Sequence, residues 1–383
     1  MKSEWNRVQV GELCSRVCSG GTPKSTNSEY YGGDIPWLNT REVNFNRISK
    51  TEGFITQAGL DNSSAKWIKK NCVIVAMYGA TAGRCAITKI PLTTNQACCN
   101  LEIDDTKADY RFVYYALKNE YVRLSSAANG GAQQNLNAQQ VKEFDIPYPS
   151  LPIQRKIASI LSSLDDKIET NNAIYRNLEE LLLAVYRNVK YVNECVVKEL
   201  HDLAEFSKNK KQISELNCQS YFSTENMLPG KAGALAAESL PTMPKATACN
   251  PGDILVSNIR PYFKKIVYCS TNCGCSSDVL CFHPKEDIYS TWLFCSLYED
   301  DFFDYVAAGS KGTKMPRGDK AHIMRYGIDV PPRKKLEEFK SMGNLVLTQI
   351  NNLRSENKHL SQLRDSILPK LMNGELDIDK IEV

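Results

Sequence analysis

The sequence lacks a long apolar run. No hydrophobic segment approaches the roughly 18 consecutive residues that mark a membrane-spanning helix, and residues 1–5 are too polar for a secretory signal peptide. A strong charge of one sign is also missing, since 47 Lys and Arg face 44 Asp and Glu and the formal net charge is +3. We therefore expect a cytoplasmic protein without a membrane partner. Any surface that binds nucleic acid must be a local basic patch.

The usual signatures of catalysis are absent as well. There is no Gly-x-x-x-x-Gly-Lys-Ser/Thr loop for a nucleotide phosphate, and the four histidines stand apart without the spacing of a triad or a metal site. Residues 258–262 approach the Asn/Asp-Pro-Pro-aromatic motif of adenine methyltransferases, but they are one residue too long and lack the double proline. We predict a chain without catalytic residues, cofactor or metal. The alternative is an enzyme with its own DNA methyltransferase or nuclease site that these motifs do not reveal.

Cysteine, in contrast, is plentiful, with fourteen residues. Several lie in apolar, strand-like runs, which is typical of free, buried thiols in a reducing compartment. The densest group contains no Cys-x-x-Cys pair, and its alternation suits a strand better than a zinc site. We predict free thiols at Cys269, Cys273, Cys275 and Cys281. The alternative is a zinc site that is formed by these cysteines and His283.

Heptad periodicity predicts two long amphipathic helices. In residues 151–190 the apolar positions alternate in steps of four and three around a polar Asn171: Ile157, Leu161, Leu164, Ile168, Tyr175, Leu178, Leu182 and Val185. A second stripe follows Phe339: Val346, Ile350, Leu353, Asn357, Leu360, Ile367 and Leu371. Neither helix can bury its stripe alone. We expect an antiparallel coiled coil whose outward charged faces, on which we place Asp165, are free for partners.

The chain also repeats itself, which indicates two related domains. The matched segments, first half before second, are 11–13 with 198–200, 71–77 with 251–257, 79–83 with 258–262, 94–96 with 276–278, 110–123 with 292–306, and 145–147 with 329–331. We predict an α+β fold with two pseudo-symmetric domains joined by the two long helices. The predicted boundaries are 1–149 for the first domain, 150–192 for the first helix, 193–332 for the second domain, and 333–383 for the second helix and tail.

Short motifs follow one another in a fixed order along nearly the whole chain. They are residues 20–23 (Gly-Gly-Thr-Pro), 32–37, 79–83, 95–97, 133–136, 146–157, 164–168 and 368–376. Together they resemble the specificity (S) subunit of type I restriction-modification systems. The resemblance implies two target-recognition domains, each of which reads one half of a bipartite site in double-stranded DNA.

The resemblance also implies partners. The long helices would act as spacers and bind two methylation (M) subunits, and restriction (R) subunits would join through the complex. Such a complex is a type I site-specific deoxyribonuclease and adenine-specific DNA methyltransferase, and the chain itself would be its non-catalytic DNA-binding subunit. We predict partner contacts on the helices at Arg155, Lys156, Asp166, Lys167, Arg354 and Lys358.

Side chains suited to DNA lie in the predicted turns and loops. Arg and Lys match guanine edges and phosphates, Asn and Gln match adenine edges, and aromatic rings stack on bases. Each is equally compatible with an ordinary polar loop. We predict DNA contacts at Lys24, Tyr30, Trp37, Arg41, Tyr78, Thr81, Arg84, Asn95, Gln96, Gln133, Gln134, Asn135, Tyr221, Asn258, Arg260, Tyr262, Lys264, Ser277, Lys311, Lys314 and Arg317.

Overall fold

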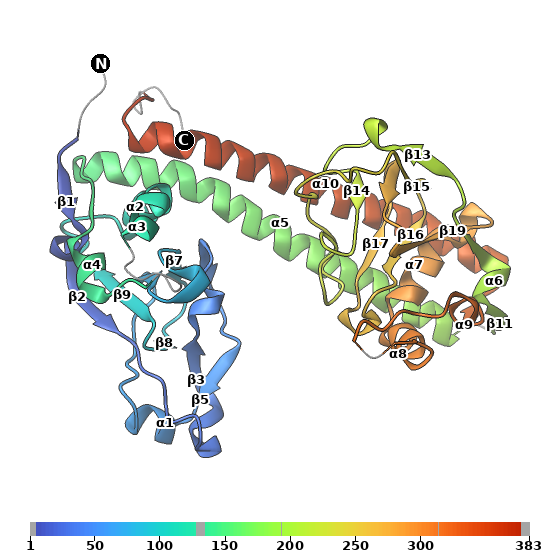
Figure 1. Cartoon of the computed structure of the whole chain (residues 1–383), viewed down its shortest axis with the longest axis horizontal. Helices are drawn as coiled ribbons and strands as arrows, with labels where there is room; N and C mark the ends of the chain where they lie inside the picture. The colour runs from blue at the N-terminus through green and yellow to red at the C-terminus, as the bar shows by residue number, and fades with distance from the viewer. Residues whose placement is uncertain (1–4, 128–134, 193, 313, 377–383) are drawn as a thin grey trace. The chain divides into compact units, whose positions relative to one another are not determined.

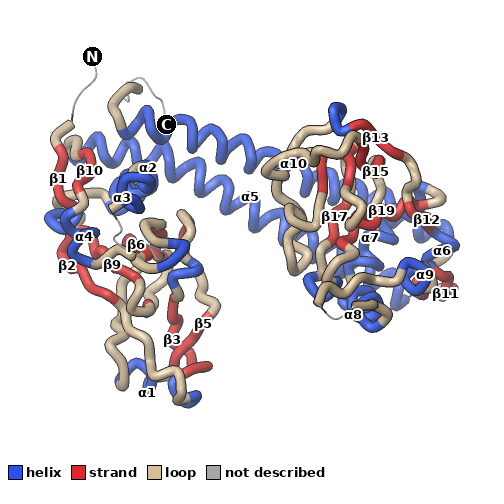
Figure 2. The backbone as a smooth tube through the Cα atoms, viewed as in Figure 1, coloured by secondary structure: helices blue, strands red, loops and turns tan. Residues whose placement is uncertain are grey.

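The structure is a computed structural model that describes residues 5–127, 135–192, 194–312 and 314–376. The chain divides into two compact units, the first formed by Met1–Glu169 with Asn357–Val383 and the second by Thr170–Glu356 (Figure 1). The dividing points fall inside two long helices, α5 (Leu151–Val192) and α10 (Arg333–Met372). Each unit therefore contains a stretch of both helices and mixes helices with strands (Figure 2). Within the described ranges, no helix has the length and apolarity needed to cross a membrane.

The first unit is built on a five-stranded sheet with the order β2-β9-β6-β7-β4. A smaller sheet has the order β5-β3-β8, and β1 pairs with β10. Neighbouring strands are antiparallel except β4 with β7 and β3 with β8. The strands are β1 (Arg7–Gln9), β2 (Cys14–Ser19), β3 (Tyr31–Leu38), β4 (Asn46–Ile48), β5 (Gly53–Ile55), β6 (Val73–Ala76), β7 (Cys85–Thr88), β8 (Thr93–Thr94), β9 (Cys98–Ile103) and β10 (Asp145–Pro147). The short helices are α1 (Gln57–Asp61), α2 (Tyr110–Asn119), α3 (Tyr121–Ser126) and α4 (Ala138–Glu143).

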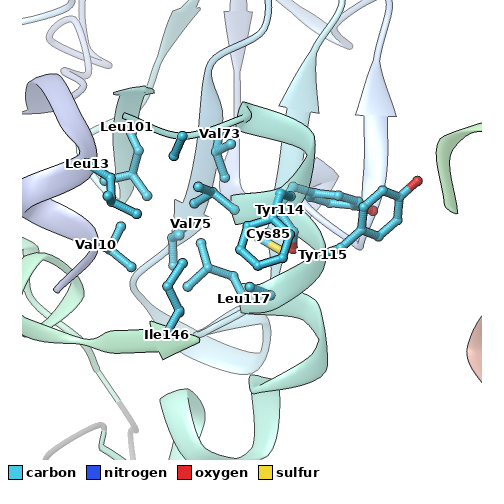
Figure 3. Packing of buried hydrophobic residues seen from close by; sticks show 14 of the residues in the cluster. Val10, Leu13, Val73, Val75, Cys85, Leu101, Tyr114, Tyr115, Leu117 and Ile146 are labelled. Atoms are coloured by element: carbon cyan, nitrogen blue, oxygen red, sulfur yellow. The ribbon is translucent and has the colours of Figure 1, made fainter. Parts of the chain in front are cut away.

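Strand β6 is the centre of the first unit, and all four of its residues are buried. Side chains alternate between the two faces of a strand. Val73 and Val75 join the core that contains α2 and the start of α5 (Figure 3). Ile74 and Ala76 join a second core on the other face. The apolar run at residues 73–77 predicts a buried strand, and β6 confirms it.

The apolar spacing of Phe112, Tyr115, Ala116 and Val122 predicts one helix over residues 110–123, but the structure interrupts it. The Asp109 side chain caps α2 by accepting a hydrogen bond from the amide of Arg111 at 2.9 Å. Helix α2 ends at Asn119, and α3 begins two residues later. This break turns Val122, which the periodicity placed on the apolar face, into solvent with 73% of its surface exposed. That prediction was wrong because a heptad-like pattern cannot register a change of helix axis.

The second unit repeats this plan. One sheet has the order β12-β19-β16-β17, another has β13-β15-β18-β14, and β11 pairs with β20. The strands are β11 (Val196–Glu199), β12 (Ala204–Phe206), β13 (Lys210–Gln212), β14 (Tyr221–Phe222), β15 (Lys245–Cys249), β16 (Ile254–Ser257), β17 (Ile266–Tyr268), β18 (Cys273–Cys275), β19 (Val279–Pro284) and β20 (Gly327–Val330). The helices are α6 (Leu200–Leu203), α7 (Ser290–Tyr298), α8 (Asp300–Ala308) and α9 (Lys320–Ile323).

Strand pairing corrects the register of the repeat. The matched elements occur in the predicted order, with β6, β7 and β9 equivalent to β16, β17 and β19. However, Val73 corresponds to Ile254 rather than to Asp253. At the ends of the two domains, Gln9 pairs with Asp145 as Glu199 pairs with Gly327. The segment equivalent to 11–13 therefore begins three residues later than predicted. The segment equivalent to 145–147 begins two residues earlier than predicted. Similar apolar runs are interchangeable by sequence, whereas hydrogen-bonded partners fix one register.

The long helices run antiparallel within each unit. In the first unit the Asp165 carboxylate accepts a hydrogen bond from Arg364 at 2.6 Å, and in the second Glu179 accepts one from Arg354 at 2.7 Å. The heptad positions are buried or half-buried, as predicted, and Asn171 is fully buried. Its amide donates to Glu356 at 2.9 Å. The antiparallel pairing predicted from the two stripes is confirmed inside both units.

Asp165 does not belong to an outward face, where the sequence placed it. It is 9% exposed, accepts a hydrogen bond from the Tyr115 hydroxyl at 2.5 Å and pairs with Arg364. Burial raises the pKa of Tyr115, so the tyrosine stays a neutral donor. One carboxylate thereby links α2, α5 and α10 in the first unit.

Replacing Asp165 by Asn should destabilise the first unit by about 3 kcal/mol, because Arg364 keeps its charge and loses a buried partner. The measurement is the urea midpoint of tryptophan fluorescence. Glu52→Gln is the control, since its partner Arg41 and Glu52 itself are 72% and 65% exposed and such pairs contribute little. Equal shifts for the two variants would show that the Asp165 network is not a stabilising element.

Candidate nucleic-acid interface

Antiparallel pairing gathers several loops of the first unit at one edge of its main sheet. Strands β2 and β6 end there and β7 and β9 begin there, because Ser19 pairs with Cys99 and Ala76 with Cys98. The amide of Met77 donates to the carbonyl of Ala97 at 2.8 Å, and the amide of Leu136 donates to Met77 at 2.8 Å. We call residues 20–22, 78–84, 95–97 and 135–136 the first loop edge.

The second unit builds the same edge with the same hydrogen bonds. The amide of Asn258, which corresponds to Met77, donates to the carbonyl of Asp278 at 2.9 Å. The amide of Gly318, which corresponds to Leu136, donates to Asn258 at 3.2 Å. We call residues 258–265, 276–278 and 316–318 the second loop edge. The two edges share one backbone design and differ in their side chains.

A turn of identical length joins β6 to β7 and β16 to β17. In the first unit the backbone is left-handed at Gly79 (φ 71°) and Gly83 (φ 82°), where glycine carries no steric penalty. The corresponding residues of the second unit are Arg260 (φ 51°) and Lys264 (φ 52°). Side chains in this conformation cost on the order of 1 kcal/mol or more each, a strain that is found chiefly at functional sites.

The turn of the second loop edge presents two aromatic rings to solvent. Tyr262 is 54% exposed and Phe263 is 38% exposed, and their ring centroids lie 4.8 Å apart. Pro261 holds the short turn between the two left-handed residues. Exposed rings on a rigid turn offer faces on which bases or sugars can stack.

The second loop edge also contains polar atoms that lack a protein partner. They are the side-chain oxygen of Asn258, Nε of Arg260 and the hydroxyl of Ser276, each buried and without a hydrogen bond to the residues that the structure describes. A buried polar atom without a partner costs about 1–3 kcal/mol. Two acceptors and one donor close to the turn are suited to a ligand that carries both kinds of group, as a base edge does. Sequence reasoning chose Ser277 and missed Ser276, although the corrected repeat register, which aligns Ser276 with Asn95, would have indicated it.

Several basic residues in or next to the second loop edge are paired with carboxylates. Lys231 and Lys264 contact Asp300 at 2.7 and 2.8 Å, and their hydrogen bonds lower the pKa of Asp300 to about 2. This carboxylate therefore keeps its charge until the pH falls well below its ordinary pKa. Lys311 pairs with Asp319 at 2.5 Å, and Arg317 pairs with Asp278 at 3.1 Å.

Two of the predicted DNA-contact residues are buried in this structure. Asn95 is 8% exposed, and its side-chain oxygen accepts a hydrogen bond from the Cys98 thiol at 3.3 Å. Tyr221 is also 8% exposed and lies in a small core. Both occupy loop or strand-end positions that look accessible in the sequence, but the adjacent sheet covers them.

The other predicted residues of the first unit are more accessible. Tyr78 is 44% exposed, and Gln96 and Asn135 are exposed on the first loop edge. Thr81 is half-buried there, and Arg84 donates to Asn44 at 2.8 Å. Residues outside the edge are exposed Lys24, half-buried Tyr30, Arg41 in its ion pair, and half-buried Trp37, whose indole donates to Gly21 at 2.9 Å. Gln133 and Gln134 lie outside the described residues.

In the second unit Ser277, Lys311, Lys314 and Arg317 are exposed, while Asn258, Arg260 and Lys264 are half-buried at the loop edge. On the long helices Arg155, Lys156 and Lys167 are exposed. Asp166 pairs with Arg47, and Arg354 pairs with Glu179 while its guanidinium lies 5.2 Å from the Tyr175 ring centroid. Lys358 is half-buried. Asp166 and Arg354 thus already have partners inside their own units.

Comparison with known proteins is consistent along the chain. A family model described as the type I restriction modification DNA specificity domain matches residues 2–180. The type I restriction enzyme MjaIX specificity subunit of Methanocaldococcus jannaschii is 26% identical and is aligned over 99% of this chain and 95% of its own length. The HindI specificity subunit of Haemophilus influenzae is 31% identical over 47% of this chain and 40% of its own length.

A solved structure supports the fold. The crystal structure of a type I restriction-modification S subunit from M. genitalium has a TM-score of 0.61 to this structure, with 17% sequence identity and 96% of each chain covered. The family model accounts for the first unit, and the full-length relative extends the match through the second. The chain is therefore similar along nearly its whole length to type I restriction-modification specificity subunits, and residues 2–180 match the DNA specificity domain of that family.

Proposed function

We propose that this protein binds a bipartite target in double-stranded DNA, that each unit reads one half, and that the protein directs M and R subunits to that site. The observation that carries the proposal is the duplicated loop edge, in which both units use the same hydrogen bonds to present different side chains. A protein that reads two unlike half-sites needs this combination of a constant frame and variable loops.

The chemistry of the second loop edge supports base reading. Arg260 has a donor without a protein partner, and Asn258 and Ser276 have acceptors without one. Arg pairs with the O6 and N7 atoms of guanine, and Asn pairs with adenine. Tyr262 and Phe263 add apolar surface beside these groups. In the first unit Tyr78, Gln96 and Asn135 supply exposed side chains of the corresponding kinds.

We assign catalysis to the partners. The complex would act as a type I site-specific deoxyribonuclease and adenine-specific DNA methyltransferase. This chain would contribute recognition of the target DNA. The exposed Arg155, Lys156 and Lys167 of α5 are our candidates for contact with two M subunits. We also propose that the long helices set the spacing between the two half-sites and that the complex works in the cytoplasm.

The decisive test is methylome sequencing of a host that carries this protein with its methylation subunit. We expect a methylated motif made of two specified parts separated by unspecified bases. A continuous motif would contradict one half-site per unit. Purified protein incubated alone with S-adenosylmethionine and DNA should transfer no methyl groups, and methylation without partners would favour the enzyme alternative.

Replacing Arg260 by Ala should weaken binding to the motif by roughly 1–3 kcal/mol and relax selectivity at one base pair. Fluorescence anisotropy with the motif and its single-base variants measures both effects. Arg333→Ala is the matched control, because Arg333 pairs with Glu286 beyond the opposite end of β19. Equal affinities for wild type and Arg260→Ala would show that the strained turn has no role in reading.

Replacing Asp300 by Asn should strengthen non-specific DNA binding, because Lys231 and Lys264 lose their carboxylate and gain access to a phosphate. The plot of log affinity against log salt should become steeper by about one. Asp287→Asn, which removes the partner of Lys340 away from the second loop edge, makes the same charge change and is the control. The same increase in slope in both variants would indicate a general charge effect and not a local phosphate contact.

A further inference from the structure

Five buried cysteines pack together in the second unit, and DNA binding gives them no role. They belong to one core between the two larger sheets: Cys249, Cys269, Cys273, Cys275 and Cys281. Cys249 ends β15 and lies opposite Cys273, the first residue of β18. Cys269 follows β17, and Cys281 lies in β19. The fold therefore brings together thiols that the sequence spreads over more than thirty positions.

Two of these thiols are close enough to react with each other. The sulfur atoms of Cys269 and Cys273 lie 3.4 Å apart, and each residue is 2% exposed. A disulfide bond is about 2.05 Å long, so the sulfur atoms would need to move together by only about 1.4 Å. Cys269 follows the end of β17 and Cys273 begins β18, so only a short connection separates the two residues.

The surroundings favour Cys273 as the nucleophile. Hydrogen bonding with the thiols of Cys249 and Cys269 lowers the pKa of Cys273 to about 5. The thiolate is the reactive form of cysteine. Burial instead raises the pKa of Cys85 and of Cys295, which lie in other cores and stay protonated.

A small molecule has a route to Cys269, one member of the pair. Cys269 lines an open pocket of about 220 Å³ together with Pro251, Gly252, Tyr268 and Ser270. A peroxide fits such a space, whereas a bulky aromatic disulfide reagent does not reach a residue that is 2% exposed. Access through this pocket distinguishes the pair from thiols that are buried without an opening.

We propose that Cys269 and Cys273 form a reversible disulfide in the folded protein when a peroxide oxidises them. The Cys273 thiolate attacks one peroxide oxygen, the O–O bond breaks, and Cys273 becomes a sulfenic acid. The sulfur of Cys269 then attacks the sulfur of Cys273, the S–O bond breaks and water leaves. In total two thiols and one hydrogen peroxide give one disulfide and two waters, and a reducing thiol reverses the change by exchange.

A metal site is the competing use for such a cluster, because zinc binds thiolates. Within the part of the chain that the structure describes, no group of three or more Cys, His, Asp or Glu side chains has a geometry that could hold a metal ion. The close sulfur pair therefore points to oxidation.

The test treats the folded, full-length protein with hydrogen peroxide, blocks remaining thiols and digests it with trypsin. Cleavage after Lys264, Lys265 and Lys285 places Cys269 and Cys273 together in residues 266–285, whereas Cys249 lies in residues 246–264. Peptide 266–285 contains four cysteines, so after peroxide we expect it to carry two blocking groups instead of four and to gain two hydrogen masses with dithiothreitol. The titratable thiols should fall from fourteen to twelve.

Single variants identify the pair. Cys269→Ala and Cys273→Ala should each abolish the loss, whereas the controls Cys85→Ala and Cys295→Ala, in other cores, should retain it. Circular dichroism establishes that each variant is folded, and Cys→Ser replaces any alanine variant that is not. A cross-link between the two peptides, an unchanged thiol count, or one zinc per chain in the untreated protein would each overturn the proposal.

Discussion

Both units depend on a central strand that is buried on both faces. A strand such as β6 or β16 has no surface for water, so its backbone must be paired on both sides and its side chains must be covered by two layers. The second sheet supplies one layer, and the short helices with the start or end of the long helices supply the other. This requirement fixes where the strand ends, and the loops that emerge there form the two loop edges.

The two loop edges share one backbone conformation, but the conformational strain that this conformation causes differs between them. The first satisfies its left-handed positions with Gly79 and Gly83, which adopt positive φ without strain. The second places Arg260 and Lys264 at the same positions and leaves neighbouring polar atoms without partners. Under the proposed function, DNA is the ligand that would satisfy these unpaired groups.

Acidic residues moderate the basic character of the second edge. Asp300, Asp319 and Asp278 hold cations that would otherwise be available to any phosphate. Phosphate contacts give affinity without sequence preference, whereas contacts to base edges discriminate. Under the proposed function, an edge with paired cations and unpaired polar groups favours selective over general DNA binding, which agrees with a net charge of only +3.

The sequence by itself determined the two long helices, the buried central strands and the duplicated order, because periodicity and apolar runs reflect burial directly. Only the tertiary structure decided the register of the repeat, which depends on long-range strand pairing such as that of Ala76 with Cys98. It also decided that Asn95 and Tyr221 are covered, that Asp165 is buried, and that Cys269 lies beside Cys273. These properties depend on residues that are distant in the chain, so local sequence patterns do not predict them.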